Sequence, residues 1–320
     1  MEKVVLGGAE QWISVRGETA SRPKPVLLFV HGGPGAAMTP WLGRFGAGLR
    51  GRFTVVSWDQ RGAGRSWRAI EPREQMTVAR LVEDTVELAR LMASRADSGK
   101  VLLVGHSFGA MLAILAASRD PGPLRALVPV APVIAGLEND RISWERTMET
   151  ARQRRVRRAV ADLEESGPPP YAGNRLFERA FVLMAWAERF SSEETGASPF
   201  RSESLAALSE SPEYDPEVRA KYWEAYQSSY EILQPQLSAI DLRREIRGLE
   251  VPVHLALGRH DRNTVPELAE SWLHHLSAPR KELVWFERSG HAPLFEEPEK
   301  FEEFLWSAAN GKGGGRRNRR

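Results

Sequence analysis

The feature that most constrains the fold of this chain is the segment Gly105-His106-Ser107-Phe108-Gly109. An apolar run at residues 101–104 precedes it, and good helix formers follow it at residues 110–117. Gly-x-Ser-x-Gly between a strand and a helix is typical of a sharp turn that exposes the serine hydroxyl. The two glycines lack the Cβ atoms that would clash in such a turn. The pattern predicts Ser107 as a nucleophile, with a purely structural turn as the alternative.

Strand-like apolar runs alternate with helical patterns along most of the chain. The expected strands cover residues 11–15, 26–30, 53–58, 101–104, 124–130, 251–257 and 282–286. Continuous apolar runs are typical of strands that are buried on both faces. Strands that alternate with helices indicate an α/β fold, in which helices cover a mostly parallel sheet.

The pattern changes to charged, aromatic-rich helices without strands at residues 137–245. We therefore expect an α/β core in two parts, 1–136 and 246–310, that is interrupted by a helical cap at 137–245. Residues 311–320 form a basic tail with five positive charges, and subtracting them from the net charge of +2 leaves −3. A Gly/Arg-rich tail cannot bury apolar surface, so we expect it to be disordered and solvated.

A serine nucleophile needs a base, and the base needs an acid that orients it. His291 follows the last expected strand, and Asp261 follows the strand before it. Both loops are expected at the carboxyl edge of the sheet, where open α/β sheets build their sites. We predict that His291 is the base and Asp261 the acid. The alternatives are a loop-stabilising role for His291 and a helix-capping role for Asp261.

Two backbone N–H groups are candidates for an oxyanion hole. One belongs to Phe108, directly after the predicted nucleophile, and the other to Gly33 in the segment His31-Gly32-Gly33-Pro34-Gly35. Glycines let the backbone approach a substrate oxygen closely, and each such donor is worth about 100- to 1,000-fold in rate. The ring of His31 is then expected to brace the glycine loop.

These segments resemble the proline iminopeptidase branch of the α/β-hydrolase superfamily. The resemblance covers residues 10–135 and 245–308, and it rests on His31–Gly35, Asp59–Ser66, Gly105–Gly109, Gly258–Asp261 and Ser289–His291. It implies a Ser107–Asp261–His291 triad, a helical cap over the site and release of an N-terminal proline from a peptide.

The chain also departs from this branch. The nucleophile turn there usually reads Gly-Gly-Ser-Trp-Gly, whereas His106 and Phe108 stand here, as in esterases of the superfamily. The branch uses cap glutamates to hold the substrate ammonium. Glu145, Glu188 and Glu224 lie beside or near tryptophans, but none matches the family pattern, so the substrate-binding residues stay unassigned.

We expect a serine hydrolase that cleaves an amide or ester through an acyl-enzyme, with a proline iminopeptidase-type aminopeptidase as the leading interpretation. An esterase, thioesterase or acyltransferase on a small secondary-metabolism substrate is the alternative. A non-catalytic ligand-binding hydrolase fold is a remote one. The mechanism implies no cofactor, and the sequence contains no metal-ligand cluster.

The absence of cysteine excludes disulfides, thiolate metal sites and a cysteine nucleophile. The first residues lack a signal-peptide pattern, and no apolar run approaches the roughly 18 to 20 residues that span a bilayer. We therefore expect a cytoplasmic protein that acts on a small molecule or short peptide, without membrane or specific nucleic-acid partners. The oligomeric state is left open.

Aromatic residues recur at helical spacing in the expected cap, at Tyr222, Trp223, Tyr226 and Tyr230. Such a stripe is typical either of an apolar substrate pocket or of packing between cap and core.

Overall fold

The computed structural model describes residues 1–17, 23–173, 175–197 and 200–311. The expected tail, apart from Gly311, lies outside the described residues. The strands are β1 (Glu2–Leu6), β2 (Ala9–Arg16), β3 (Val26–Val30), β4 (Thr54–Asp59), β5 (Val101–His106), β6 (Leu124–Val130), β7 (Val253–Gly258) and β8 (Lys281–Phe286). The α-helices are α1 (Thr39–Phe45), α2 (Ala47–Arg52), α3 (Val78–Arg95), α4 (Phe108–Arg119), α5 (Gly136–Gln153), α6 (Arg157–Ser166), α7 (Leu176–Thr195), α8 (Phe200–Glu210), α9 (Pro216–Ala239), α10 (Leu242–Glu245), α11 (Pro266–His275), α12 (Pro293–Glu296) and α13 (Pro298–Asn310). The short 3₁₀ segments η1 (Gly64–Ile70) and η2 (Arg73–Gln75) follow β4.

The strands form one eight-stranded sheet in the order β1-β2-β4-β3-β5-β6-β7-β8. β1 pairs antiparallel with β2, and β2 pairs antiparallel with β4. The neighbours from β4 to β8 are parallel. The predicted α/β fold with a mostly parallel sheet is confirmed. β1 is an addition to the expected strands, and its inward residues are Val4 and Leu6.

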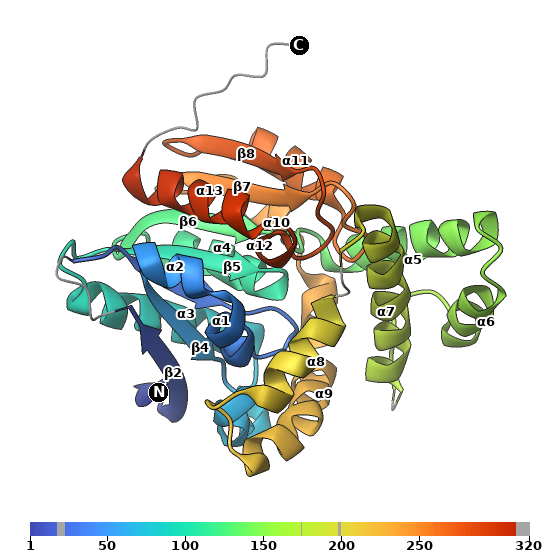
Figure 1. Ribbon diagram of the computed structural model, residues 1–320, viewed down its shortest axis with the longest axis horizontal. Coiled ribbons are helices and arrows are strands. Elements are labelled where there is room, and N and C mark those ends of the chain that lie inside the picture. Colours follow the sequence, from blue (N-terminus) through green and yellow to red (C-terminus); the bar gives the residue numbers. More distant parts are fainter. Residues whose placement is uncertain (18–22, 174, 198–199, 312–320) are drawn as a thin grey trace.

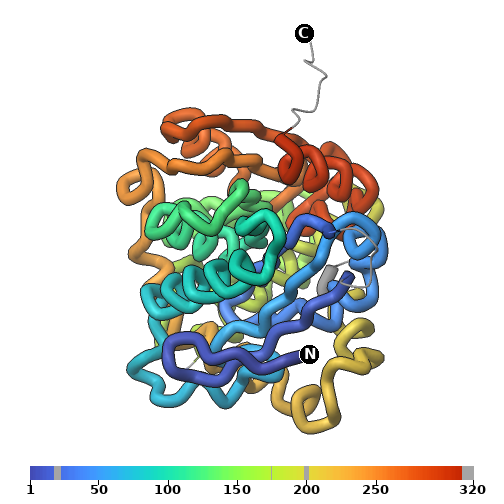
Figure 2. Tube along the Cα trace, turned by 90° about the vertical axis from the view of Figure 1, so that its left-hand side faces the viewer, coloured from blue at the N-terminus to red at the C-terminus, as the bar shows by residue number. Residues whose placement is uncertain are grey.

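Helices cover both faces of the sheet (Figures 1 and 2). Successive side chains of a strand point to opposite faces. In β3, Leu28 and Val30 join the core that contains α3, α4 and α11, while Leu27 and Phe29 join the core that contains α1, α2 and α13. The sheet is thus buried on both sides, which explains the continuous apolar runs of its central strands.

A helical insertion, α5–α9, separates β6 from β7 (Figure 1). Its start and end meet, because Ala135 and Asp241 form an antiparallel bridge. The insertion also has an apolar cluster of its own, which includes Met148, Leu163 and Phe190. It is therefore a compact helical unit set between two parts of the core.

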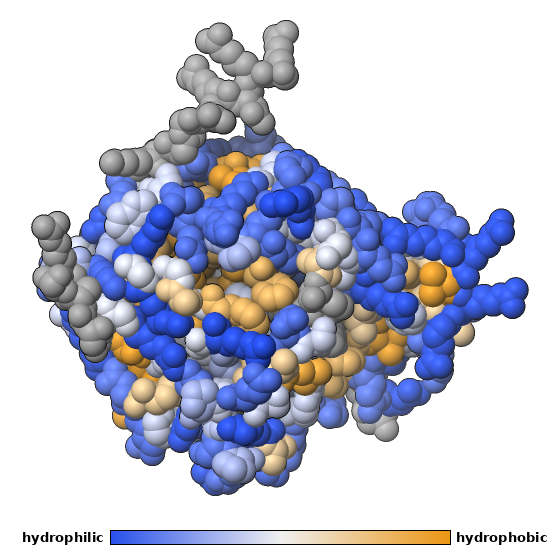
Figure 3. All heavy atoms as spheres, in the orientation of Figure 1, coloured by the Kyte–Doolittle hydropathy of each residue, from blue (hydrophilic) through white to orange (hydrophobic). Residues whose placement is uncertain are grey.

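The surface seen in the orientation of Figure 1 is mostly hydrophilic, and hydrophobic residues gather near its centre and along the inserted helices (Figure 3). Among the described residues, no helix is sufficiently long and apolar to cross a bilayer.

Candidate active site

Ser107 lies at the sharp turn between β5 and α4, where its φ of 57° and ψ of −120° place it in a conformation that is rare for a residue with a side chain. Close packing enforces the turn. A Cβ atom on Gly105 would lie 2.3 Å from the carbonyl oxygen of Gly109, and one on Gly109 would lie 2.2 Å from that of Val30. Both positions of the motif therefore require glycine.

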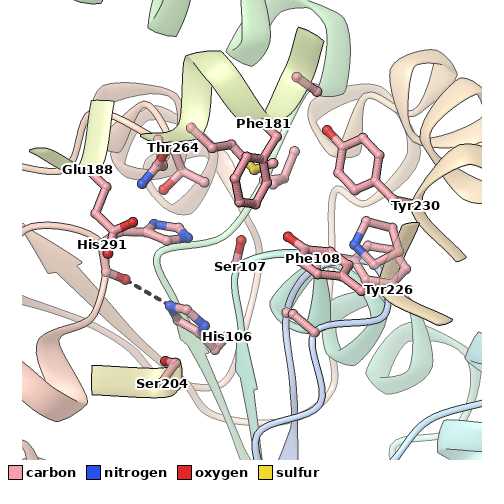
Figure 4. Close-up of a pocket in the computed structure, with 18 of the residues that line it drawn as sticks. His106, Ser107, Phe108, Phe181, Glu188, Ser204, Tyr226, Tyr230, Thr264 and His291 are labelled. Atoms are coloured by element: carbon pink, nitrogen blue, oxygen red, sulfur yellow. Dashed lines mark hydrogen bonds between the residues drawn. The ribbon is translucent and has the colours of Figure 1, made fainter. Parts of the chain in front are cut away.

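His291 and Asp261 come together at the carboxyl edge of the sheet. The loop after β7 carries Asp261 and the loop after β8 carries His291. Nδ1 of His291 lies 2.8 Å from Oδ2 of Asp261. A carboxylate only accepts hydrogen bonds, so Nδ1 donates, which leaves Nε2 as the acceptor in the neutral ring. Figure 4 shows the Ser107 hydroxyl and the His291 imidazole side by side in one cavity.

Several hydrogen bonds hold Asp261 as a carboxylate. Oδ1 accepts from the backbone N–H groups of Asn263 (2.8 Å) and Thr264 (3.0 Å), and Oδ2 accepts from the Thr264 hydroxyl at 2.6 Å. Burial alone would raise the pKa of Asp261, but His291 and these donors hold it below its ordinary value. Asp261 thus stabilises its own turn and also contacts the imidazole.

The pKa of His291 shifts in the opposite direction. Burial alone would lower this pKa, but the charge of Asp261 and its hydrogen bond outweigh burial, and the net pKa is raised. Glu188 and Glu296 add to the rise. The imidazole is therefore a stronger base than an ordinary histidine.

The glycine loop lies directly against the predicted nucleophile. A Cβ atom on Gly32 would lie 3.1 Å from Cβ of Ser107. Gly33 has a φ of +118°, and a Cβ atom there would lie 2.5 Å from the backbone nitrogen of Gly35. Phe108 is the first residue of α4, where the helix dipole favours negative charge. Gly33 and Phe108 both line the cavity.

The ring of His31 ties this loop to the turn after β4. Its Nε2 accepts from the backbone N–H of Gln60 at 3.2 Å, and its Nδ1 donates to the carbonyl of Gly32 at 2.8 Å. The Gln60 side chain donates to the carbonyl of His31 at 2.7 Å. Burial lowers the pKa of His31 to about 4, so the ring is neutral near pH 7.

The cavity lies between the core and the inserted helices. The aromatic residues Tyr222, Trp223, Tyr226 and Tyr230 line it, and Tyr226 and Tyr230 also pack against Phe177 within the insertion. The stripe therefore lines the cavity and packs within the insertion, and the Tyr222 hydroxyl also donates to the carbonyl of Ala37 in the core at 3.0 Å.

Acidic side chains also line the cavity: Asp140 of α5, Glu188 of α7 and Glu296 of α12. Burial raises the pKa of Asp140 to about 6 and that of Glu296 to about 7. Glu145 and Glu224 are exposed instead, and Glu224 pairs with Lys221 at 2.7 Å. Among the three glutamates that the sequence offers beside tryptophans, only Glu188 lies at the cavity.

The model of the alpha/beta hydrolase family matches residues 27–304. The chain belongs to this family. The chain is 25% identical over 310 residues to a probable aminopeptidase, YbaC, of Bacillus subtilis, covering 95% of this chain and 94% of that protein. It is 26% identical to a proline iminopeptidase of Heyndrickxia coagulans, covering 87% of each chain. The crystal structure of a proline iminopeptidase from Mycobacterium smegmatis has the same fold, with a TM-score of 0.70, 21% identity and coverage of 98% and 99%.

Several side chains at the site were not predicted from the sequence. Thr264 lies three residues after Asp261, at a spacing that suits a hydroxyl bond back to a turn carboxylate. Glu296 lies five residues after His291, in the short helix that follows the base. Asp140 had no local signal, because only the packing of α5 turns it toward the cavity.

Proposed function

We propose that this protein is a serine hydrolase that releases an N-terminal residue from a short peptide, with a proline iminopeptidase-type preference. Ser107 attacks the scissile carbonyl, and His291, oriented by Asp261, takes its proton and gives it to the leaving amine. Water then attacks the acyl-enzyme while His291 takes its proton, and this proton returns to Ser107 as the N-terminal residue is released. The N–H groups of Gly33 and Phe108 stabilise the oxyanion. The chain's distant similarity to aminopeptidases supports this proposal.

The observation that carries the substrate assignment is the acidic lining of the cavity. An aminopeptidase substrate brings a free α-ammonium group into a partly desolvated site, and a buried cation needs a negative partner. Asp140 and Glu188 are such partners. A simple acyl ester carries no positive charge, so these carboxylates would not stabilise its binding.

The apolar side of the cavity suits a small hydrophobic residue such as proline. Phe181, Trp223 and Tyr226 form one aromatic group, with ring centroids 5.9 Å apart for Phe181–Trp223 and for Trp223–Tyr226. The same apolar wall favours the second candidate function, hydrolysis of an ester with an apolar acyl group. We propose that the insertion, with boundaries near residues 137 and 245, acts as the cap that shapes this pocket.

A substrate panel separates the two candidates. We expect the protein to cleave prolyl p-nitroanilide at least about 100-fold more efficiently, in kcat/KM, than N-acetylprolyl p-nitroanilide, because acetylation removes the positive charge. Ser107→Ala should lower the turnover of every substrate by about 10⁴-fold or more. The matched control is Ser271→Ala, which removes an exposed hydroxyl on α11.

If the protein cleaves p-nitrophenyl butyrate efficiently and neither anilide, it is an esterase and the aminopeptidase proposal is wrong. Full activity of Ser107→Ala toward any of these substrates would contradict the mechanism itself.

A further inference from the structure

The peptide unit between His291 and Ala292 is held at both of its polar ends. Nε2 of His106 lies 2.8 Å from the carbonyl oxygen of His291 (Figure 4). At the other end, the N–H of Ala292 donates to Oε2 of Glu296 at 3.2 Å. A peptide unit is planar, so holding its oxygen and its nitrogen limits rotation of the whole plane.

Glu296 also holds the backbone on the other side of the imidazole. Its Oε2 accepts a second hydrogen bond, from the N–H of Gly290 at 2.8 Å. One carboxylate oxygen therefore binds the residue before and the residue after His291. Neither contact involves the imidazole, whose Nδ1 bonds to Asp261. The backbone that carries the ring is thus held independently of the ring.

The acceptor decides the direction of the His106 hydrogen bond. A carbonyl oxygen only accepts, so Nε2 of His106 carries the hydrogen and donates it to His291. Burial lowers the pKa of His106 to about 3, so the ring stays neutral at working pH. Its ring centroid lies 4.8 Å from that of His291, at an interplanar angle of 48°. His106 therefore supports the base through both a hydrogen bond and ring contact.

We propose that His106 and Glu296 are positioning residues that set the direction in which the imidazole of His291 projects toward Ser107. This inference rests on the proposed function, in which His291 is the base. His106 immediately precedes Ser107, so its hydrogen bond ties the loop of the base to the turn of the nucleophile. A misplacement of a catalytic group by 1 Å can lower the rate by about 100-fold, so a hydrogen bond that fixes the loop of His291 should affect the rate.

The test measures the rate at which a fluorophosphonate probe labels Ser107 in the full-length protein, with each preparation normalised to its number of titratable sites. The probe carries no ammonium group, so the result does not depend on substrate preference. His106→Phe keeps a ring but removes the donor, and Glu296→Leu removes the acceptor. We expect each to label about 10- to 100-fold more slowly than the wild type.

The conservative variants distinguish positioning from packing. His106→Gln keeps a donor near the position of Nε2, and Glu296→Gln keeps an acceptor oxygen. Each should recover a labelling rate within about threefold of the wild type. With p-nitrophenyl acetate, the slow variants should lose kcat while KM changes little. His274→Phe, at an exposed position on α11, is the control and should label at the wild-type rate.

Two results would overturn the inference. One is wild-type labelling per titrated site in both His106→Phe and Glu296→Leu. The other is a labelling rate in His106→Gln and Glu296→Gln that is as low as in His106→Phe and Glu296→Leu. If His106→Phe does not fold, the two variants of Glu296 decide the question. If the wild-type protein is not labelled at all, the proposed function fails instead.

Discussion

The conformation of Ser107 shows how the chemistry depends on its immediate neighbours. A residue with a side chain at φ 57°, ψ −120° is strained by about 1–3 kcal/mol. The strain persists because the surroundings leave no alternative: the N–H of Ser107 bonds to the carbonyl of Val130 at 2.9 Å, and Gly109 packs against the end of β3. The position of the Ser107 hydroxyl at the cavity results from this packing.

The pH dependence of the reaction should report the raised pKa of His291. His291 accepts a proton only when it is neutral, so activity should fall as the pH drops through a value above 6.5, the ordinary pKa of histidine. Asp261→Asn removes the charge that raises this pKa. The acid limb of kcat/KM should then move to lower pH, and the plateau should fall by about 10⁴-fold. Ester hydrolysis between pH 5 and 9 measures both effects.

An acid limb at the same pH in the wild type and in Asp261→Asn would contradict this electrostatic role. Asp215→Asn is a suitable control, because Asp215 is the N-cap of α9: its carboxylate accepts from the N–H of Val218 at 3.0 Å and pairs with Arg65 at 3.4 Å.

At the scale of elements, the turn after β4 joins separate parts of the molecule. Asp59 accepts hydrogen bonds from the Thr39 hydroxyl at 2.6 Å and from the Tyr214 hydroxyl of the insertion at 2.8 Å. Arg61 donates hydrogen bonds to Asp84 of α3 at 3.0 Å and to the carbonyl of Leu6 in β1 at 3.0 Å. This turn therefore connects the core, the N-terminal strand and the inserted helices.

The buried ion pair in this junction should dominate its stability. The side chains of Arg61 and Asp84 are 2% and 0% exposed. Asp84→Ala would leave the guanidinium buried without its charge partner, so we expect it to lower the free energy of unfolding by about 3–5 kcal/mol. Urea denaturation, followed by circular dichroism, measures this change.

The adjacent residue provides the matched control. Glu83, whose side chain is 42% exposed, pairs with Arg80 and Arg119. Glu83→Ala should change the free energy of unfolding by only about 0–1 kcal/mol. Equal effects of the two substitutions would show that burial of the Arg61–Asp84 pair is not what stabilises the junction.

At the scale of the whole molecule, the cavity belongs to neither the core nor the insertion alone. Ser107, His291 and Glu296 come from the core, while Asp140, Glu188 and the aromatic residues come from inserted helices. The core provides the groups proposed for bond cleavage, and the insertion provides much of the wall that a substrate would contact.

Neutralising the acids of the insertion should therefore change substrate binding more than chemistry. At pH 8, above the Asp140 pKa of about 6, the Asp140 carboxylate should be charged. We expect Asp140→Asn and Glu188→Gln each to raise KM for prolyl p-nitroanilide by about 10- to 100-fold, since a hydrogen bond to a charged group is worth about 1.5–3 kcal/mol. Hydrolysis of p-nitrophenyl acetate should change by less than about threefold.

Glu145→Gln removes an exposed carboxylate of α5 and is the control for the loss of charge. A KM for the anilide that stays at the wild-type value in both cavity variants would contradict a role for these acids in binding the ammonium group.

Much of the fold could be predicted from the sequence because its signals are local. The apolar run, the glycines and the helix formers around Ser107 lie within 17 residues of each other, at positions 101–117. Parallel strands bring their carboxyl ends to one edge of a sheet, so loops after β5, β7 and β8 had to meet there. The order of Ser107, Asp261 and His291 was therefore informative without any knowledge of distances.

What only the tertiary structure decided is which similar residues face the site. Glu145, Glu188 and Glu224 look alike in sequence, but the packing of α5, α7 and α9 leaves Glu188 at the cavity and the other two in solvent. His106 likewise appeared only as a departure from a motif, whereas the structure places it on the carbonyl of His291, 185 residues away. Such contacts depend on how whole elements pack, and no local pattern encodes that packing.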